Sequence, residues 1–361
     1  MIYLDNAATA PMCEAAKKAI IEHLGDFGNP SSNHELGRQS RVLIENARER
    51  IAKRINAEPN EIYFTSGGSE ANTWALSNYA TLSTKIEHHS VKTHCNDIGV
   101  NKEGFVDPQS FSFINHRLAK LFELGSCMYV NNELGTIQPV KVVATIMHGK
   151  HMLFHTDAVQ AVGHIPIDVK DLNCDMLSAS AHKFGGSKGI GFLYIKNGTK
   201  MKPLINGGKQ EQGMRGGTEN LLGIVSMAAA LDDAVEHMEE RNKHIKYLRD
   251  KLLDKLLQIP DSYLNGSLEN RIPGNINIRF SRVSGSRLVT LCSLYGVYIS
   301  SGSACNEGVS TPSHVLKAIG LTDEEALSSI RITIGHTNTE EEIDQAADII
   351  TALVERIRNE Y

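Results

Sequence analysis

A lysine and an aspartate that each follow a strand-like run are the first residues in this sequence that could do chemistry. Lys183 comes just after the run Met176–Ser180, and its amine could form an imine with an aldehyde cofactor. Asp157 closes another run, in FHTDAVQ, where a carboxylate could keep a pyridine nitrogen protonated and make the ring an electron sink. Each residue also has an ordinary interpretation, because most lysines lie on surfaces and an aspartate there could cap a helix.

Two glycine-rich segments could bind phosphate. FTSGGSEAN, residues 64–72, places Gly67, Gly68 and Ser69 between a predicted strand and a predicted helix. Exposed amides and the helix dipole would form an anion site there, with Ser69 expected at the N-cap, although an ordinary glycine turn is equally compatible. GGSKGIG, residues 185–191, matches some nicotinamide-binding turns, but its glycines precede a strand-like run instead of opening a helix. The second segment therefore does not indicate a dinucleotide site.

A cysteine and an arginine near the carboxyl end have unusual surroundings. Cys305 lies in ISSGSACNEGVSTPSHVL, where small polar residues indicate an exposed loop suited to a transfer thiol, with a buried inert cysteine as the alternative. Arg331, in SSIRITIG, has apolar neighbours. Either the α-carboxylate of a substrate or a structural ion pair would explain it.

Histidines cluster between residues 87 and 95, in EHHSVKTHC. Their spacing fits no common zinc pattern, so we predict no metal site. An imidazole can stack on a flat cofactor ring and move protons near neutral pH, which makes either His88 or His89 a functional candidate.

The elements that must position these residues follow an α/β pattern. Helical periodicity alternates with β-branched runs, which predicts a largely parallel sheet whose ligands gather beyond the carboxyl ends of its strands. Apolar residues recurring every four positions predict a helix over Ser40–Asn56. The predicted strands are Glu61–Thr65, Cys127–Val130, Met152–His155, Met176–Ser180 and Gly191–Ile195.

The last third of the chain has a different pattern. An almost continuous helix is predicted over Leu221–Ile259 and ends at Pro260. The elements expected after it are strands at Gly274–Phe280, Gly296–Ser300 and Ser329–Gly335, a helix from near Thr311, and a final helix from Thr339. We therefore expect a large domain over residues 13–240 and a small domain formed by residues 1–12 and 241–361.

Composition narrows the functional class. The 361 residues are 41% hydrophobic, which is enough for a large core, and a net charge of −5 argues against a nucleic-acid partner. Six cysteines without a CxxC pair favour a reducing cytoplasm. The N-terminal segment MIYLDNAATAP lacks the features of a signal peptide, and the most apolar stretch, Leu221–Ala230, is too short to span a membrane.

In their order along the chain, these segments resemble the cysteine desulfurases, a branch of the class V aminotransferase-like, fold type I pyridoxal-phosphate enzymes. The resemblance runs from YLDNAATA at residues 3–10 to SSIRITIGHTNTEEEID, and diverges mainly between His94 and Val130. It implies a large domain with a mainly parallel seven-stranded sheet and a smaller α+β domain. The blocks that carry it are FGNPSS (27–32), FTSGGSEAN (64–72), VNNELGTIQP (130–139), HTDAVQAVG (155–163), SAHKFGG (180–186), GMRGGTEN (213–220) and SSGSACN (300–306).

The resemblance also implies roles for individual residues. Lys183 would hold pyridoxal 5′-phosphate as an imine, Asp157 would pair with its ring nitrogen, and His88 would stack on the ring. Gln160 would contact the ring hydroxyl, and Asn132 and Arg331 would bind the substrate carboxylate. The phosphate would be bound by Gly68, Ser69, Ser180, His182 and, from the neighbouring subunit of a homodimer, Thr218.

The implied reaction converts L-cysteine to L-alanine and leaves the sulfur as a persulfide on Cys305. A thiol on an acceptor protein, a cluster scaffold or a tRNA-thiolation enzyme, would then remove that sulfur. The long loop around Cys305 suggests direct delivery. The alternatives are a selenocysteine lyase, another class V enzyme, or an inactive scaffold with the same fold; Cys305 argues against an aminotransferase, which needs no thiol there.

Overall fold

The computed structural model describes residues 1–92, 95–112, 121–301, 305–306 and 309–360. A seven-stranded sheet forms the centre of the larger part, in the order β2-β8-β7-β6-β5-β3-β4. Strand β8 is antiparallel to β2 and β7, while the other neighbouring strands are parallel. The fold is therefore α/β with a mainly parallel sheet, as the sequence predicts.

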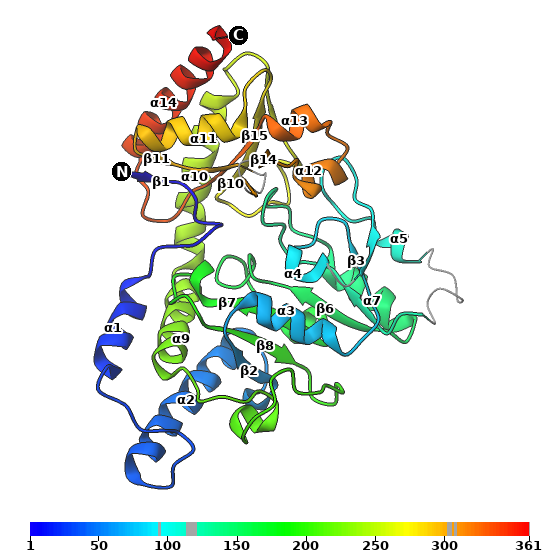
Figure 1. Ribbon diagram of the computed structural model, residues 1–361, viewed down its shortest axis with the longest axis vertical. Helices are drawn as coiled ribbons and strands as arrows, with labels where there is room; N and C mark the ends of the chain where they lie inside the picture. Colours follow the sequence, from blue (N-terminus) through cyan, green and yellow to red (C-terminus); the bar gives the residue numbers. More distant parts are fainter. Residues whose placement is uncertain (93–94, 113–120, 302–304, 307–308, 361) are drawn as a thin grey trace.

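The large sheet and its helices occupy the lower part of Figure 1. The strands are β2 (Ile62–Thr65), β3 (Thr81–Thr84), β4 (Cys95–Ile98), β5 (Leu124–Ser126), β6 (Leu153–Asp157), β7 (Met176–Ser180) and β8 (Gly191–Ile195). The helices are α1 (Glu14–His23), α2 (Glu35–Arg54), α3 (Gly68–Ser77), α4 (His89–Lys92), α5 (Pro108–Ser112), α7 (Val140–Gly149), α8 (Val169–Leu172) and α9 (Leu221–Glu236).

A second, four-stranded sheet lies in the upper part of Figure 1, in the order β12-β15-β10-β9. Its strands are β9 (Ser262–Leu264), β10 (Asn275–Phe280), β12 (Ser300–Ser301) and β15 (Ser329–Thr333). The remaining pairs are β1 (Ile2–Tyr3) with β11 (Val297–Tyr298), and β13 (Cys305–Asn306) with β14 (Val309–Ser310). The helices are α10 (Met238–Leu256), α11 (Gly285–Leu294), α12 (His314–Ala318), α13 (Asp323–Leu327) and α14 (Glu340–Asn359).

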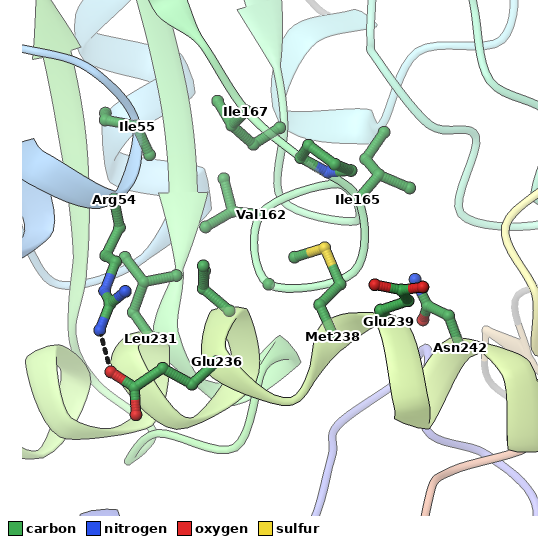
Figure 2. A pocket seen from close by; sticks show the side chains of 13 residues that line it. Arg54, Ile55, Val162, Ile165, Ile167, Leu231, Glu236, Met238, Glu239 and Asn242 are labelled. Atoms are coloured by element: carbon green, nitrogen blue, oxygen red, sulfur yellow. Dashed lines mark hydrogen bonds and ion pairs between the residues drawn. The ribbon is translucent and has the colours of Figure 1, made fainter.

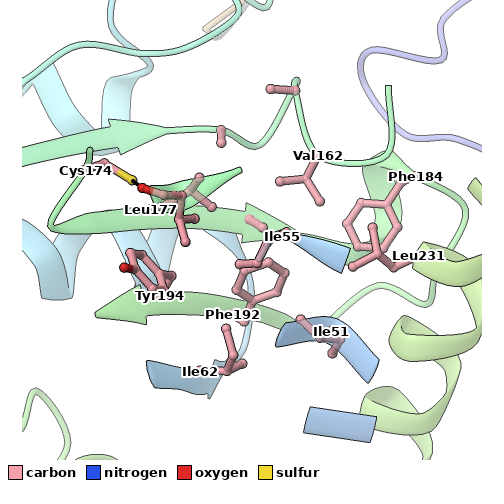
Figure 3. Packing of buried hydrophobic residues seen from close by; sticks show 14 of the residues in the cluster. Ile51, Ile55, Ile62, Val162, Cys174, Leu177, Phe184, Phe192, Tyr194 and Leu231 are labelled. Atoms are coloured by element: carbon pink, nitrogen blue, oxygen red, sulfur yellow. Dashed lines mark hydrogen bonds between the residues drawn. The ribbon is translucent and has the colours of Figure 1, made fainter. Parts of the chain in front are cut away.

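Side chains of the large sheet alternate between two buried faces. On β8, Phe192 and Tyr194 pack with α2 and α9, whereas Leu193 packs with Trp74 of α3. Figure 3 shows Phe192 and Tyr194 packed with Ile51 of α2 and other apolar residues on the first face. Burial on both faces explains why the apolar residues of β8, GFLYI, follow one another without alternating with polar ones, as in strands that are covered on both sides.

The chain returns to its own beginning in the second part. Leu4, Leu252 of α10, Ile332 of β15 and Ile350 of α14 belong to one buried cluster. This core is separate from the cluster around α2 and α9. The proposed division at residues 12 and 240 remains a prediction.

Four predicted elements differ from the structure. The strand expected at Cys127–Val130 is β5, Leu124–Ser126, and the continuous helix breaks at His237 (φ −106°, ψ 10°) between α9 and α10. The strand expected at Gly296–Ser300 is divided into β11 and β12, and the helix expected near Thr311 begins at His314. Strands β3 and β4 were not predicted. In the part of the chain that the structure describes, no helix is long and apolar enough to cross a membrane.

Candidate active site

Lys183 lies at the end of a short 3₁₀ helix, Ala181–Lys183, directly after β7. Its Nζ donates hydrogen bonds to the carbonyls of Ala7, at 2.6 Å, and Ala8, at 2.8 Å. Burial, followed by the positive charge of Arg331, lowers the pKa of the amine to about 8, although Asp157 and Asp5 oppose the shift. Much of the amine is therefore neutral, and nucleophilic, at mildly alkaline pH.

Asp157 ends β6, the strand next to β7 in the sheet. Its carboxylate is buried, and Oδ2 accepts a 2.6 Å hydrogen bond from Nδ2 of Asn72. The other oxygen, Oδ1, accepts from the amide of Val159 at 3.0 Å. These two bonds stabilise a carboxylate at the carboxyl edge of the sheet, where ligands of α/β proteins gather.

A chain of hydrogen bonds joins Asp157 to His88. Nδ2 of Asn72 donates to Asp157 and also to Oγ of Ser90, at 2.9 Å. Ser90 Oγ lies 2.7 Å from Nδ1 of His88. Desolvation by surrounding atoms lowers the pKa of His88, and neighbouring Lys183 and His89 lower it further, while Asp157 opposes them. Of the two histidine candidates, His88 is therefore the one connected to Asp157.

The glycine turn after β2 lies against the end of β7. Gly67 has φ 153°, and a Cβ built on it would lie 3.5 Å from Oγ of Ser180. A Cβ on Gly68 would come within 2.5 Å of Val159, so a side chain does not fit there. The N-cap of α3 is Gly67, and Ser69 lies inside the first turn, because the helix begins earlier than predicted.

The other predicted cofactor ligands are less closely grouped. Gln160 is buried, and its Nε2 donates to the Ala7 carbonyl at 2.9 Å. His182 Nδ1 lies 3.2 Å from Oγ1 of Thr9, and burial lowers the pKa of its imidazole to about 4. Thr218 is exposed. Gln160 thus donates to the same Ala7 carbonyl that accepts a hydrogen bond from Lys183.

Arg331, on β15, lies beside Asn132 and Asp5. Nη1 donates to the backbone carbonyl of Asn132 at 3.0 Å, and Nη2 donates to Oδ1 of Asp5 at 2.9 Å. The contact with Asn132 thus joins the predicted pair of carboxylate-binding residues through the backbone. The carboxylate of Asp5 was not predicted from the sequence.

Two buried carboxyl groups near the site were also not predicted from the sequence. Burial raises the pKa of Glu87 to about 8 and that of Glu133 to about 7. Glu87 Oε1 accepts from the hydroxyl of Thr84 and the amide of Met128, and Glu133 accepts from Oγ of Ser313 at 2.5 Å. A signal was present in the sequence, because each glutamate adjoins a candidate residue, His88 or Asn132.

One pocket in the described structure contains candidate residues, and another does not. One, of about 360 Å³, is lined by Lys183 and Gln160 together with the N-terminal segment and residues 233–245. Another, of about 630 Å³, lies at the α9–α10 junction, away from the candidate residues. Figure 2 shows the ion pair between Arg54 and Glu236 at this second pocket. Of these two pockets, the first is therefore the one associated with the candidate site.

Comparisons with known proteins give the family. The model of the family "Aminotransferase class-V" matches residues 2–346. The chain is 41% identical over 378 residues to cysteine desulfurase IscS of Methanosarcina thermophila, covering 99% of this chain and 93% of that protein. It is 43% identical to cysteine desulfurase IscS of Dictyoglomus turgidum, with 99% and 95% coverage. The chain belongs to the cysteine desulfurases of the class V aminotransferase family.

Solved structures agree with this assignment. A "NifS-like protein" superposes with a TM-score of 0.90 at 35% identity, covering 98% of this chain and 99% of that one. The NifS-like protein from Rickettsia africae gives a TM-score of 0.89 at 32% identity, with 99% coverage of both chains. The desulfurase therefore has the fold type I architecture along nearly its whole length.

The residues of the desulfurase fit pyridoxal phosphate, the cofactor of this family. Lys183 supplies a half-buried amine of lowered pKa, and Asp157 supplies a carboxylate fixed by two hydrogen bonds. Asn72 adds a buried Oδ1 without a hydrogen-bond partner among the described residues. An amine, a carboxylate and a glycine turn are the groups that an aldehyde, a ring nitrogen and a phosphate require.

Cys305 of the desulfurase lies in β13, which pairs with β14 so that Cys305 is opposite Ser310. Its side chain lies outside the described residues, so its predicted role stays a prediction. Strand β12 precedes it, and there Ser300 pairs with Arg331 on β15. Cys305 therefore follows closely, along the chain, a strand that is hydrogen-bonded to the strand of Arg331. Among the residues that the structure describes, no metal-binding cluster occurs.

Proposed function

We propose that this desulfurase binds pyridoxal 5′-phosphate on Lys183 and moves the sulfur of L-cysteine to Cys305, releasing L-alanine. When bound, pyridoxal phosphate supplies an electron sink for the α-carbon of an amino acid. Asp157 would face its ring nitrogen, His88 and Gln160 would contact the ring, and Gly68, Ser69, Ser180 and His182 would hold its phosphate. The observation that carries the proposal is the hydrogen-bonded chain from Asp157 through Asn72 and Ser90 to His88, with the amine of Lys183 close enough to interact electrostatically with Asp157 and His88.

Lys183 and His88 would move the protons. The Lys183 amine, with a pKa of about 8, can both take up and release a proton near neutral pH. The lowered pKa of His88 favours a neutral imidazole, which can accept a proton. Arg331 and Asn132 would bind the α-carboxylate, so that the α-proton is held near these bases.

Cys305 would accept the sulfur. Its thiolate attacks the sulfur atom of the substrate, an S–S bond forms as the carbon–sulfur bond breaks, and the electron pair left on carbon takes up a proton. Cysteine and the Cys305 thiol thus give alanine and a persulfide, with no external oxidant. A thiol of an acceptor protein, a cluster scaffold or a tRNA-thiolation enzyme, would then remove the outer sulfur by exchange.

The decisive test combines a spectrum with product assays. Purified wild type, Lys183→Ala and Cys305→Ala would be compared for visible absorption, for alanine formed from L-cysteine, and for protein-bound persulfide. We expect an absorption band in wild type that is lost in Lys183→Ala, and alanine and persulfide from wild type but not from Cys305→Ala. A wild-type protein that cannot be loaded with pyridoxal phosphate would refute the proposal.

We also propose that the active form is a homodimer in the cytoplasm. Thr218 is exposed, which leaves it available to the phosphate site of a second subunit. Mixed dimers of Lys183→Ala and Thr218→Val chains would contain one site with both native residues. Activity recovered on mixing the two inactive or weakened variants supports the shared site, and activity equal to the average of the two parents contradicts it.

A further inference from the structure

The guanidinium of Arg331 is already bound by a carboxylate of its own chain. Its Nη2 donates to Asp5 and its Nη1 to the Asn132 carbonyl. Its Nε is buried and has no hydrogen-bond partner among the residues that the structure describes. The side chains of Arg331 and Asp5 are 11% and 18% exposed, so water screens their attraction only weakly.

The backbone around Asp5 is firmly attached to the strand of Arg331. Asp5 forms a β-bridge with Thr333, and Thr333 Oγ1 accepts from the amide of Ala7 at 2.9 Å. The hydroxyl of Tyr3 donates to the carbonyls of Asp5, at 3.0 Å, and Thr9, at 2.7 Å. The contact with Arg331 can therefore be released by rotation of the Asp5 side chain without movement of the backbone.

We propose that Asp5 is a positioning residue that occupies Arg331 until the α-carboxylate of L-cysteine displaces it. The inference rests on the proposed function, in which Arg331 binds that carboxylate. A single oxygen of Asp5 satisfies Nη2 and leaves Nε without an acceptor. A carboxylate that accepts from both Nη2 and Nε forms a bidentate pair, which is stronger and more directional than a single hydrogen bond.

Because a ligand must displace Asp5 to reach Arg331, the affinity of the site for that ligand would depend on whether the ligand has a carboxylate. Asp5 carries one negative charge, so its replacement at Arg331 by another carboxylate keeps the guanidinium paired. A ligand without a carboxylate cannot compensate for the lost ion pair, because it would leave a largely buried guanidinium without a countercharge. Asp5 therefore competes with the α-carboxylate and weakens the binding of α-amino acids, whereas a neutral derivative leaves the pair of Asp5 and Arg331 in place.

The experiment compares wild-type holoenzyme with Asp5→Asn, using L-cysteine and L-cysteine methyl ester as substrates. Asparagine keeps the size of the side chain but forms only a neutral hydrogen bond with Arg331. Because charge-assisted bonds are about twice as strong as neutral ones, we expect the KM for L-cysteine to fall by about fivefold. The KM for the methyl ester should stay the same, so the change should appear in KM and only for the ligand with a carboxylate.

Two further variants make the result decisive. Tyr3→Phe loosens the same segment but keeps the carboxylate, so its KM for L-cysteine should equal that of wild type. A KM for L-cysteine that is unchanged or raised in Asp5→Asn, or a parallel change for the ester, would overturn the inference.

Arg331→Gln tests the underlying function. If Arg331→Gln keeps the wild-type preference for L-cysteine over the ester, the proposed role of Arg331 is wrong. If Arg331→Gln abolishes that preference but Asp5→Asn leaves it unaltered, only the proposed role of Asp5 is wrong.

Discussion

The amine of Lys183 lies between opposing charges. Burial and Arg331 favour its neutral form, whereas Asp157 and Asp5 favour its ammonium form. The result is a pKa of about 8 in place of the ordinary value near 10.5. The amine can thus serve both as a nucleophile and as a proton carrier over the pH range in which proteins are stable.

The uptake of pyridoxal phosphate by cofactor-free protein should follow this pKa. Only the neutral amine attacks an aldehyde, so the rate should rise with pH and level off above about 8. Stopped-flow absorption between pH 6 and 10 measures the midpoint, with Lys183→Ala as the control that shows no band. A midpoint near 10.5 would mean that the surroundings do not lower the pKa of the amine.

Asn72 should matter although it was not predicted from the sequence. Asn72→Ala removes the hydrogen bonds to Asp157 and Ser90 and leaves the carboxylate with the Val159 amide. A hydrogen bond to a charged group contributes about 1.5–3 kcal/mol, so kcat/KM should fall roughly 10- to 100-fold. The matched control is Asn78→Ala at the C-cap of the same helix. Equal losses in both variants would indicate a general effect on α3.

At the scale of elements, a buried ion pair joins helix α2 to the segment that leads to Thr218. Arg48 donates to both oxygens of Glu211 at 2.8 Å, and Glu211 also accepts from the amide of Phe64 on β2. Both charged side chains are buried. Such a pair connects elements that are distant in sequence, and the loss of one partner leaves the other charge uncompensated.

Glu211→Gln should therefore destabilise the protein strongly. We expect a decrease of about 3–5 kcal/mol in the free energy of unfolding, measured by urea denaturation, because the Arg48 guanidinium stays buried. Glu45, the half-exposed second partner of Arg48, offers a matched comparison. Glu45→Gln should cost less than about 1 kcal/mol. Similar decreases in the free energy of unfolding of the two variants would mean that burial does not determine how much each ion pair contributes to stability.

Local patterns predicted the elements that have clear ends and missed those defined by distant contacts. Strands β7, MLSAS, and β8, GFLYI, agree with their predicted bounds because both are short segments rich in apolar residues. Strand β3, TLST, has no such run, and its position depends on pairing with β4 and β5. The break at His237 has no proline or glycine to signal it. Likewise, Lys183 and Asp157 could be proposed as site residues from the strand-like runs at which they lie, whereas Asp5 meets Arg331 only in the folded chain.

At the scale of the whole molecule, stability should depend on buried groups that titrate in opposite directions. His155 is buried between Ser126 and Ser178, and burial lowers its pKa to about 3. The unfolded chain takes up a proton at His155 below about pH 6.5, whereas the folded protein does not. The stability of the folded protein therefore decreases as the pH falls below that value. Glu87, with its raised pKa, has the opposite effect, because the folded protein holds its proton better than the unfolded chain.

His155→Gln should reduce the sensitivity of the fold to acid. The amide can bond the same serines without titrating, so the loss of stability between pH 7 and pH 5 should be smaller than in wild type by roughly 2 kcal/mol. Urea unfolding at the two pH values gives this difference. His151→Asn, at an exposed position, is the control and should retain the wild-type loss. Identical losses in His155→Gln and wild type would show that His155 does not carry this dependence.

The attachment of the first residues to the last strand has a consequence for synthesis on the ribosome. Residues 2–9 pair with β11, with β15 and with Lys183, and β15 is among the last elements to be translated. The sheet around Lys183 can fold while the ribosome is still adding residues, because domains fold as units from the amino end. The amino end itself must wait for Thr333 before it can close over the lysine. An incomplete chain would then hold a folded sheet whose Lys183 still lacks the carbonyls of Ala7 and Ala8 as acceptors until translation ends.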